Sequence, residues 1–270
     1  MLKYNNIIIQ NKLFIKYNNP LLYYLKINNN YLFLNKLINK IFIIKFIKFI
    51  CFNCKKKTIK FKEGYCKKCY FLKKFNICIF KPELCTSHLN IKNKYNKYKK
   101  FEFYKHIVYL SYTSNIKIGV TIKKNFKNRL MDQGAIIAIK IAITPNRYIS
   151  GLIEKICKNK INDKTNYRLM LINNNYNLII IKKLINLKKK IKKNIKIFKK
   201  YLIKENIIYI FNYPIKNINN KLKINIINFN KKKKFKNKLK GIKGQYLIFK
   251  KNKVLNIRNN IGNIFNIYIQ

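Results

Sequence analysis

The sequence predicts an α+β fold, and three observations support this prediction. Two CxxC pairs lie within residues 51–69, a spacing typical of a β-rich zinc ribbon. Residues 106–161 have the pattern of strand, strand, helix, strand and helix. The two ends of the 270-residue chain alternate apolar and polar residues and are rich in β-branched and aromatic side chains. We therefore expect a β-rich zinc-ribbon module, a mixed core and further β strands at both ends.

The chain divides by composition into four expected segments. They are an N-terminal β-rich segment (1–50), a cysteine-rich zinc module (51–105), a β-β-α-β-α core (106–182), and a basic helix followed by C-terminal strands (183–270). Within the last segment, residues 183–205 predict the basic helix, and the charge run at 230–238 predicts a loop.

The first cysteine group consists of Cys51, Cys54, Cys66 and Cys69. Two CxxC knuckles on neighbouring hairpins can bring four thiolates to the corners of a tetrahedron, which is the geometry of structural Zn²⁺ sites. Gly64 precedes the second pair and suits the tight turn that such a knuckle needs. Buried or redox-active thiols are the alternative interpretation, but two such pairs in one window favour zinc.

A second group follows, with Cys78, Cys85 and His88. These three residues predict a second zinc site only if a fourth ligand arrives from elsewhere, because structural zinc takes four ligands. His106 is the only other histidine in the chain. The alternatives are a degraded site, or two buried thiols near a surface imidazole.

The core elements follow from local patterns. Residues 106–112 and 116–122 predict a strand hairpin, since each is apolar and β-branched and a short turn joins them. The remaining elements are a short helix at 126–134, a buried strand at 135–144 that stops at Pro145, and a helix over 148–161.

The charge of the chain is extreme: 62 Lys and Arg residues stand against 7 Asp and Glu residues, a net charge of +55. Such a surface attracts polyanions, so we expect nucleic acid as a partner. A/T-rich codons alone could also produce this composition. The sequence shows no secretory signal, and its most apolar run, residues 41–52, is too short to span a membrane. We therefore expect a cytoplasmic bacterial protein from an A/T-rich genome, without membrane association.

Motifs over more than half of the chain resemble an uncharacterised bacterial family that is defined by a domain of unknown function. The matching stretches are CxxC…GYCxxC, PELC, HIVYL, KIGVT, DQGA, PNRY…G…E, DKTNYRLML and, near the end, LKGIKGQYLIF. This resemblance brings no established activity.

The core also resembles the GIY-YIG nuclease superfamily, which shares its order of strands and helices. The resemblance implies that Tyr109 helps to activate water, that Arg129 holds phosphate and that Glu154 binds a divalent metal such as Mg²⁺, with Gly119 as the motif glycine. The sequence departs from the pattern at Ile107, where glycine is expected, and at Lys117, where the second tyrosine is expected.

The residue types are consistent with a polyanion site. A guanidinium can hold two phosphate oxygens at once, which lysine cannot do, and three of the four arginines fall within residues 129–168. The expected nucleic-acid-binding residues are Lys117, Arg129, Arg147, Lys164 and Arg168. As alternatives, Glu154 could form a buried ion pair and Tyr109 could be a core aromatic residue.

The sequence therefore predicts a zinc-stabilised nucleic-acid-binding protein whose core grips phosphate. A metal-dependent endonuclease acting on DNA or structured RNA is the second interpretation, and a zinc-held protein adaptor is the third. The sequence leaves open whether the chain is an enzyme. It shows no Walker loop, dinucleotide fingerprint or serine-type triad.

Overall fold

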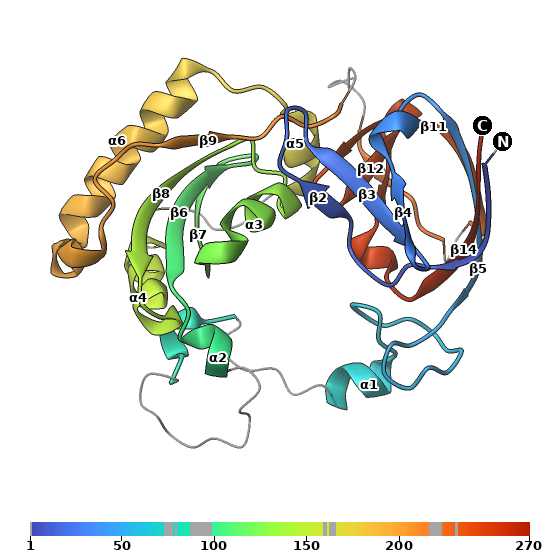
Figure 1. The fold of residues 1–270 in the computed structure, drawn as a ribbon, viewed down its shortest axis with the longest axis horizontal. Helices are drawn as coiled ribbons and strands as arrows, with labels where there is room; N and C mark the ends of the chain where they lie inside the picture. The colour runs from blue at the N-terminus through green and yellow to red at the C-terminus, as the bar shows by residue number, and fades with distance from the viewer. Residues whose placement is uncertain are drawn as a thin grey trace. The chain divides into compact units, whose positions relative to one another are not determined.

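The computed structural model describes residues 2–72, 78, 80–86, 99–158, 161, 166–215, 223–229 and 232–270. The fold is mixed α+β, as predicted, with three sheets among the described residues (Figure 1). The chain forms two compact units. The terminal unit comprises Met1–Lys74 and Asn212–Gln270, so it unites the two ends of the chain, and the central unit comprises Phe75–Phe211.

The terminal unit contains a seven-stranded sheet with strand order β1-β14-β5-β11-β12-β13-β10. Its strands are β1 (Leu2–Ile8), β5 (Ile41–Phe49), β10 (Asn225–Ile226), β11 (Lys234–Lys243), β12 (Tyr246–Phe249), β13 (Lys253–Asn256) and β14 (Asn263–Ile269). A three-stranded sheet adds β2 (Phe14–Lys16), β3 (Leu22–Ile27) and β4 (Asn30–Phe33). The first strand pairs antiparallel with the last, which confirms the expectation of β structure at both ends.

The charge run at 230–238 is not a loop as predicted, because β11 begins at Lys234 and pairs antiparallel with β5. Lys234 and Lys236 are exposed, whereas the ring of Phe235 between them packs against Phe249 at a centroid distance of 5.0 Å. The strand alternation is therefore present, but lysine occupies the whole solvent-facing side and makes the segment look unstructured in sequence.

The central unit contains a four-stranded sheet with strand order β7-β6-β8-β9. The strands are β6 (His106–Tyr112), β7 (Ile116–Ile122), β8 (Ile137–Thr144) and β9 (Ile208–Ile210). The α-helices of this unit are α2 (Lys99–Glu102), α3 (Phe126–Asp132), α4 (Arg147–Lys158), α5 (Tyr167–Ile172) and α6 (Leu178–Asn194). The strand, strand, helix, strand, helix order is thus present, and β6 and β7 have the predicted bounds.

Short elements complete the chain. Among the described residues of the terminal unit lies the α-helix α1 (Lys67–Leu72). The 3₁₀ helices are η1 (Asn35–Leu37), η3 (Pro82–Leu84), η5 (Lys123–Asn125), η6 (Lys196–Tyr201), η7 (Lys250–Asn252) and η8 (Arg258–Asn260). The predicted basic helix at 183–205 corresponds to α6, which begins earlier and ends earlier, followed by η6. Among the described residues, no helix has the length and apolar character needed to cross a bilayer.

The two faces of the central sheet pack against different helices. Val108 and Leu110 of β6 belong to an apolar core that α4 and α6 complete. Tyr109, which alternation turns to the other face, packs its ring against Phe126 of α3 at 5.6 Å. Figure 1 accordingly shows α6 and α3 on opposite sides of the sheet. Because β7 is an edge strand of this sheet and contacts both α3 and α4, the polar residues of these elements can meet at that edge.

Candidate metal centres and a basic cavity

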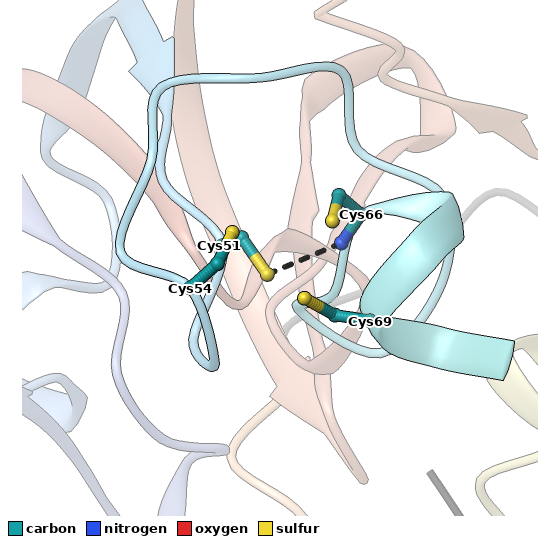
Figure 2. Close-up of side chains that lie close together, drawn as sticks. All are labelled: Cys51, Cys54, Cys66 and Cys69. Atoms are coloured by element: carbon teal, nitrogen blue, oxygen red, sulfur yellow. Dashed lines mark hydrogen bonds between the residues drawn. The ribbon is translucent and has the colours of Figure 1, made fainter. Parts of the chain in front are cut away.

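The first cysteine group forms one cluster in the terminal unit. The sulfurs of Cys51, Cys54, Cys66 and Cys69 all lie within 4.8 Å of one another, and Figure 2 shows the four side chains gathered together. The first pair follows β5 and the second lies at the start of α1. Between them the chain reverses at Gly64, whose φ of 85° is in the left-handed region that favours glycine.

The surroundings of this cluster shift the pKa values of two of its thiols in opposite directions. The backbone N–H of Cys66 donates to Sγ of Cys51 at 3.4 Å, and the side-chain amide of Asn53 donates to Sγ of Cys69 at 3.5 Å. Burial raises the pKa of Cys51, but hydrogen bonds from backbone N–H groups outweigh it and lower the pKa to about 6. For Cys66 the backbone N–H of Cys69 lowers the pKa, yet burial and the neighbouring thiols raise it to about 11.

These opposite pKa shifts indicate that a bound cation would stabilise the thiolates of the cluster. One thiol ionises easily, and its negative charge then opposes ionisation of the next. A divalent ion removes this conflict, because it binds all four sulfurs as thiolates. The four cysteines can therefore hold a metal ion such as zinc.

A second cluster lies in the central unit and differs from the predicted one. Cys78, Cys85 and Glu102 are buried, and their ligand atoms lie within 4.8 Å of one another. Sγ of Cys78 donates to Oε1 of Glu102 at 3.0 Å. The hydrogen bond with Cys85 raises the pKa of Cys78, and burial and the Glu102 carboxylate raise it further. The predicted ligand His88 lies outside the described residues.

A cavity of about 230 Å³ opens at the β7 edge of the central sheet. Six of the residues singled out in the sequence line it: Tyr109, Lys117, Gly119, Arg129, Arg147 and Glu154. Lys158 and Gln133 line it as well and were not predicted. Arg168 is exposed on α5 and does not belong to this lining, and Lys164 lies outside the described residues.

Tyr109 and Gly119 fit against each other on neighbouring strands. They are direct partners in the β6–β7 ladder, and a Cβ atom on Gly119 would lie 2.7 Å from Oη of Tyr109. Glycine therefore leaves the space that the tyrosine ring fills beside the cavity. The Tyr109 hydroxyl donates to Oε1 of Gln133 at 3.3 Å.

The tyrosine hydroxyl keeps its proton at neutral pH. Burial raises the pKa of Tyr109 to about 12, and the Glu154 carboxylate acts in the same direction. The charge and hydrogen bond of the Arg129 guanidinium oppose this rise without cancelling it. These interactions link Tyr109 to both of the other residues that the nuclease resemblance implied.

Glu154 is a buried carboxylate among cations. Its Oε1 lies 3.6 Å from Nζ of Lys158, one turn further along α4. Burial raises the pKa of Glu154, while Lys158 lowers it, Glu83 raises it and Arg147 lowers it. The predicted alternative of an ion pair is therefore realised with Lys158, and Glu154 also lines the cavity.

The PELC turn (82–85) and the residue Phe80 before it form one wall of the cavity, which is lined by Phe80 and Pro82. This turn packs closely on α4, because a Cβ atom on Gly151 would lie 2.3 Å from the backbone nitrogen of Glu83. The Nε of Arg147 also donates to the carbonyl oxygen of Cys78 at 2.9 Å. The turn, the second cysteine cluster and the cavity are thus directly connected.

Fold and site together define a mixed α+β protein with a four-cysteine cluster and a basic cavity at a sheet edge. The chain belongs to the family described as Protein of unknown function (DUF2797), whose family model matches residues 40–264. The match covers both cysteine clusters and the whole cavity lining, and it confirms the resemblance to a family without an assigned activity. No curated protein and no solved structure matches the chain.

Proposed function

We propose that this chain is a zinc-stabilised nucleic-acid-binding protein whose cavity holds a backbone phosphate. One observation carries the proposal: the cavity lining includes four cations, Lys117, Arg129, Arg147 and Lys158, and one carboxylate, Glu154. A partly enclosed site with this excess of positive charge favours an anion, because the low local dielectric strengthens the attraction.

The types of side chain in the cavity suit a phosphodiester. Arg129 is exposed on α3, so its guanidinium can donate two hydrogen bonds to one phosphate group. Gln133, which accepts the hydrogen bond from the Tyr109 hydroxyl, lines the cavity and carries a side-chain NH₂ group as a further donor. The net charge of +55 concentrates any polyanion near the protein, whatever its base sequence.

The cysteine module, residues 51–69, has a structural role in this proposal. We assign its metal as Zn²⁺, because four thiolates match the tetrahedral site that zinc prefers over harder cations. The ion would hold the two knuckles together beside β5. It takes no part in phosphate binding.

An equilibrium binding titration with a labelled oligonucleotide tests the proposal. Arg129→Ala should weaken binding about tenfold and reduce the slope of log K against log salt by about one, since one phosphate contact is lost. Lys189→Ala removes one exposed charge from α6, away from the cavity lining, and serves as the matched control. Equal losses in the two variants would contradict a role for the cavity.

A second candidate function is a metal-dependent endonuclease. It is favoured by the presence of Tyr109, Arg129 and Glu154 on one cavity, as the GIY-YIG resemblance implies. Glu154 would hold Mg²⁺ together with substrate phosphate oxygens, and the ion would supply charge stabilisation to the phosphoryl group. Binding remains the leading proposal, because Lys117 replaces the second motif tyrosine and Tyr109 keeps its proton.

Incubation of DNA and RNA substrates with Mg²⁺ or Mn²⁺ separates the two functions. An endonuclease should cleave at least one single-stranded, duplex or branched substrate, and Glu154→Gln should abolish cleavage while it leaves binding nearly intact. Cleavage that persists in Glu154→Gln would remove that residue from the reaction. The absence of cleavage with every substrate would leave the binding function alone.

A further inference from the structure

We propose that Cys78, Cys85 and Glu102 are ligands of a second zinc ion, in the central unit and independent of the four-cysteine cluster. The group unites the PELC turn with the short helix α2, which ends at Glu102. The proposal concerns metal binding, so it stands whether or not the cavity binds nucleic acid.

The geometry suits a single ion. Ligands of one tetrahedral zinc with Zn–S near 2.3 Å and Zn–O near 2.1 Å lie about 3.6–3.8 Å apart. The two sulfurs and the carboxylate oxygen all lie within 4.8 Å of one another, and Cys78 donates to Glu102 at 3.0 Å. A zinc ion would replace the proton in that hydrogen bond and separate the two atoms slightly.

The buried position of these three side chains also favours a bound cation. Cys78, Cys85 and Glu102 are 3 %, 2 % and 7 % exposed, so none of them is well solvated in its ionised form. Three groups that become anionic cannot all ionise side by side in such a place unless a positive charge joins them. Zinc supplies that charge, and thiolate with carboxylate is a donor set that it accepts.

A buried histidine four residues after Glu102 also has an unpaired ring nitrogen in the described part of the chain. His106 is fully buried, and its Nδ1 lies 2.6 Å from the carbonyl oxygen of Tyr104, a contact in which Nδ1–H donates. Nε2 is then left with its lone pair, and among the described residues it has no hydrogen-bond partner. A metal-binding histidine has this arrangement, with its other N–H donated to a carbonyl or carboxylate.

The fourth ligand of this zinc is not fixed by the three residues. Structural zinc takes four ligands, so the three assigned here leave one position for a nitrogen or a water molecule. His106 is not one of the residues whose ligand atoms lie within 4.8 Å of one another, so its Nε2 would have to move closer to fill this position in place of a water molecule.

The second zinc would support the wall of the cavity. Cys78 accepts a hydrogen bond from Arg147 through its carbonyl oxygen, and Pro82 lies in the turn that ends at Cys85. Fixing Cys78 and Cys85 to α2 would therefore hold the turn against α4.

Metal analysis of the full-length protein tests the proposal. We expect about two zinc ions per wild-type chain and about one in Cys66→Ser, Cys85→Ser or Glu102→Gln. Cys157→Ala is the matched control, because Cys157 is a buried cysteine of α4 outside both clusters, and it should keep both ions.

X-ray absorption at the zinc edge provides a readout on wild-type protein, which does not depend on the folding of any variant. One four-sulfur site and one two-sulfur site together give about three sulfur ligands per zinc, with oxygen or nitrogen in the remaining positions. A single zinc with four sulfurs, a zinc content that Cys85→Ser leaves unchanged, or a Cys78–Cys85 disulfide in freshly purified protein would overturn the proposal. Loss of zinc in Arg129→Ala is not expected, so a failure of the binding function remains distinguishable.

Discussion

At the scale of single residues, Glu154 combines two opposed influences. Its burial disfavours the ionised carboxylate, whereas Lys158 and Arg147 favour it. Burial prevails, so the pKa of Glu154 is raised above its ordinary value. The folded chain thus binds this proton more tightly than the unfolded chain does. Ionisation of the carboxyl group therefore costs more free energy in the folded chain, unless a further cation joins it.

The pH dependence of Glu154→Gln follows from this shift. A raised carboxyl pKa contributes stability that is present below the unfolded pKa and is lost as the pH rises through the folded pKa. Without added divalent metal, Glu154→Gln should therefore melt about 2–4 °C above wild type at neutral pH. The difference should vanish in acid. Thermal unfolding across pH measures it.

Glu63→Gln is the control for this comparison, because Glu63 is an exposed carboxylate outside the cavity lining and its substitution should change the melting temperature little. A Glu154→Gln variant that is less stable than wild type at neutral pH would show that the ion pair with Lys158 dominates.

The sequence predicted some site residues and missed others. Tyr109, Arg129 and Glu154 could be found because they stand at recognisable positions in a motif pattern. Glu102 could not, since it lies far along the chain from Cys78 and only folding brings the two together. The ion pair of Lys158 with Glu154 could have been predicted from the sequence, because the two residues are four apart on one helix.

At the scale of elements, the close contact of the PELC turn with α4 depends on Gly151. The nearest atoms to a Cβ at this position are the backbone nitrogen of Glu83 at 2.3 Å and the carbonyl carbon of Pro82 at 2.4 Å. Backbone atoms cannot move aside as the end of a flexible side chain can, so the turn itself would have to shift.

Gly151→Ala should therefore destabilise the protein, although alanine is the better helix former. We expect a loss of about 1–3 kcal/mol in the free energy of unfolding, the usual cost of overpacking. Lys155→Ala is exposed on the same helix and should change stability by less than about 0.5 kcal/mol. Denaturant unfolding of both variants checks this, and equal stabilities would contradict the close packing.

The proposed zinc ion would hold the cysteine module, residues 51–69, together. A structural zinc couples metal binding to local folding. Cys66→Ser should therefore make residues 52–72 a site of rapid proteolysis, several-fold faster than in wild type, and chelation of the metal should have the same effect on wild type. Limited proteolysis with mass spectrometry locates the cleavage. Cleavage confined to other segments would contradict a zinc-held module.

The strands with many apolar residues were predicted well. The prediction failed at the N-terminal part of β11 for a physical reason. The bounds of β6 and β7 match the prediction because both strands are apolar and a short turn separates them. The N-terminal part of β11 was missed because its outward positions are lysines, so only pairing with β5 shows that Phe235 faces inward. Pairing between distant segments is what local patterns do not contain.

At the scale of the whole molecule, the described residues include exposed lysines spread over the surface and a cavity whose lining gathers several charged side chains. Most of the 62 basic residues require no specific partner, since exposed lysines are well solvated. The cavity differs, because four cations and a buried carboxylate line about 230 Å³ at one sheet edge. The account therefore assigns general attraction to the surface and phosphate binding to the cavity.

The most direct test of this account is a crystal structure of the full chain with a short single-stranded oligonucleotide. The account predicts a backbone phosphate inside the cavity, within hydrogen-bond distance of the Arg129 guanidinium and beside Tyr109 and Lys117. An oligonucleotide bound along α6 or the lysines of β11, with no phosphate in the cavity, would contradict it.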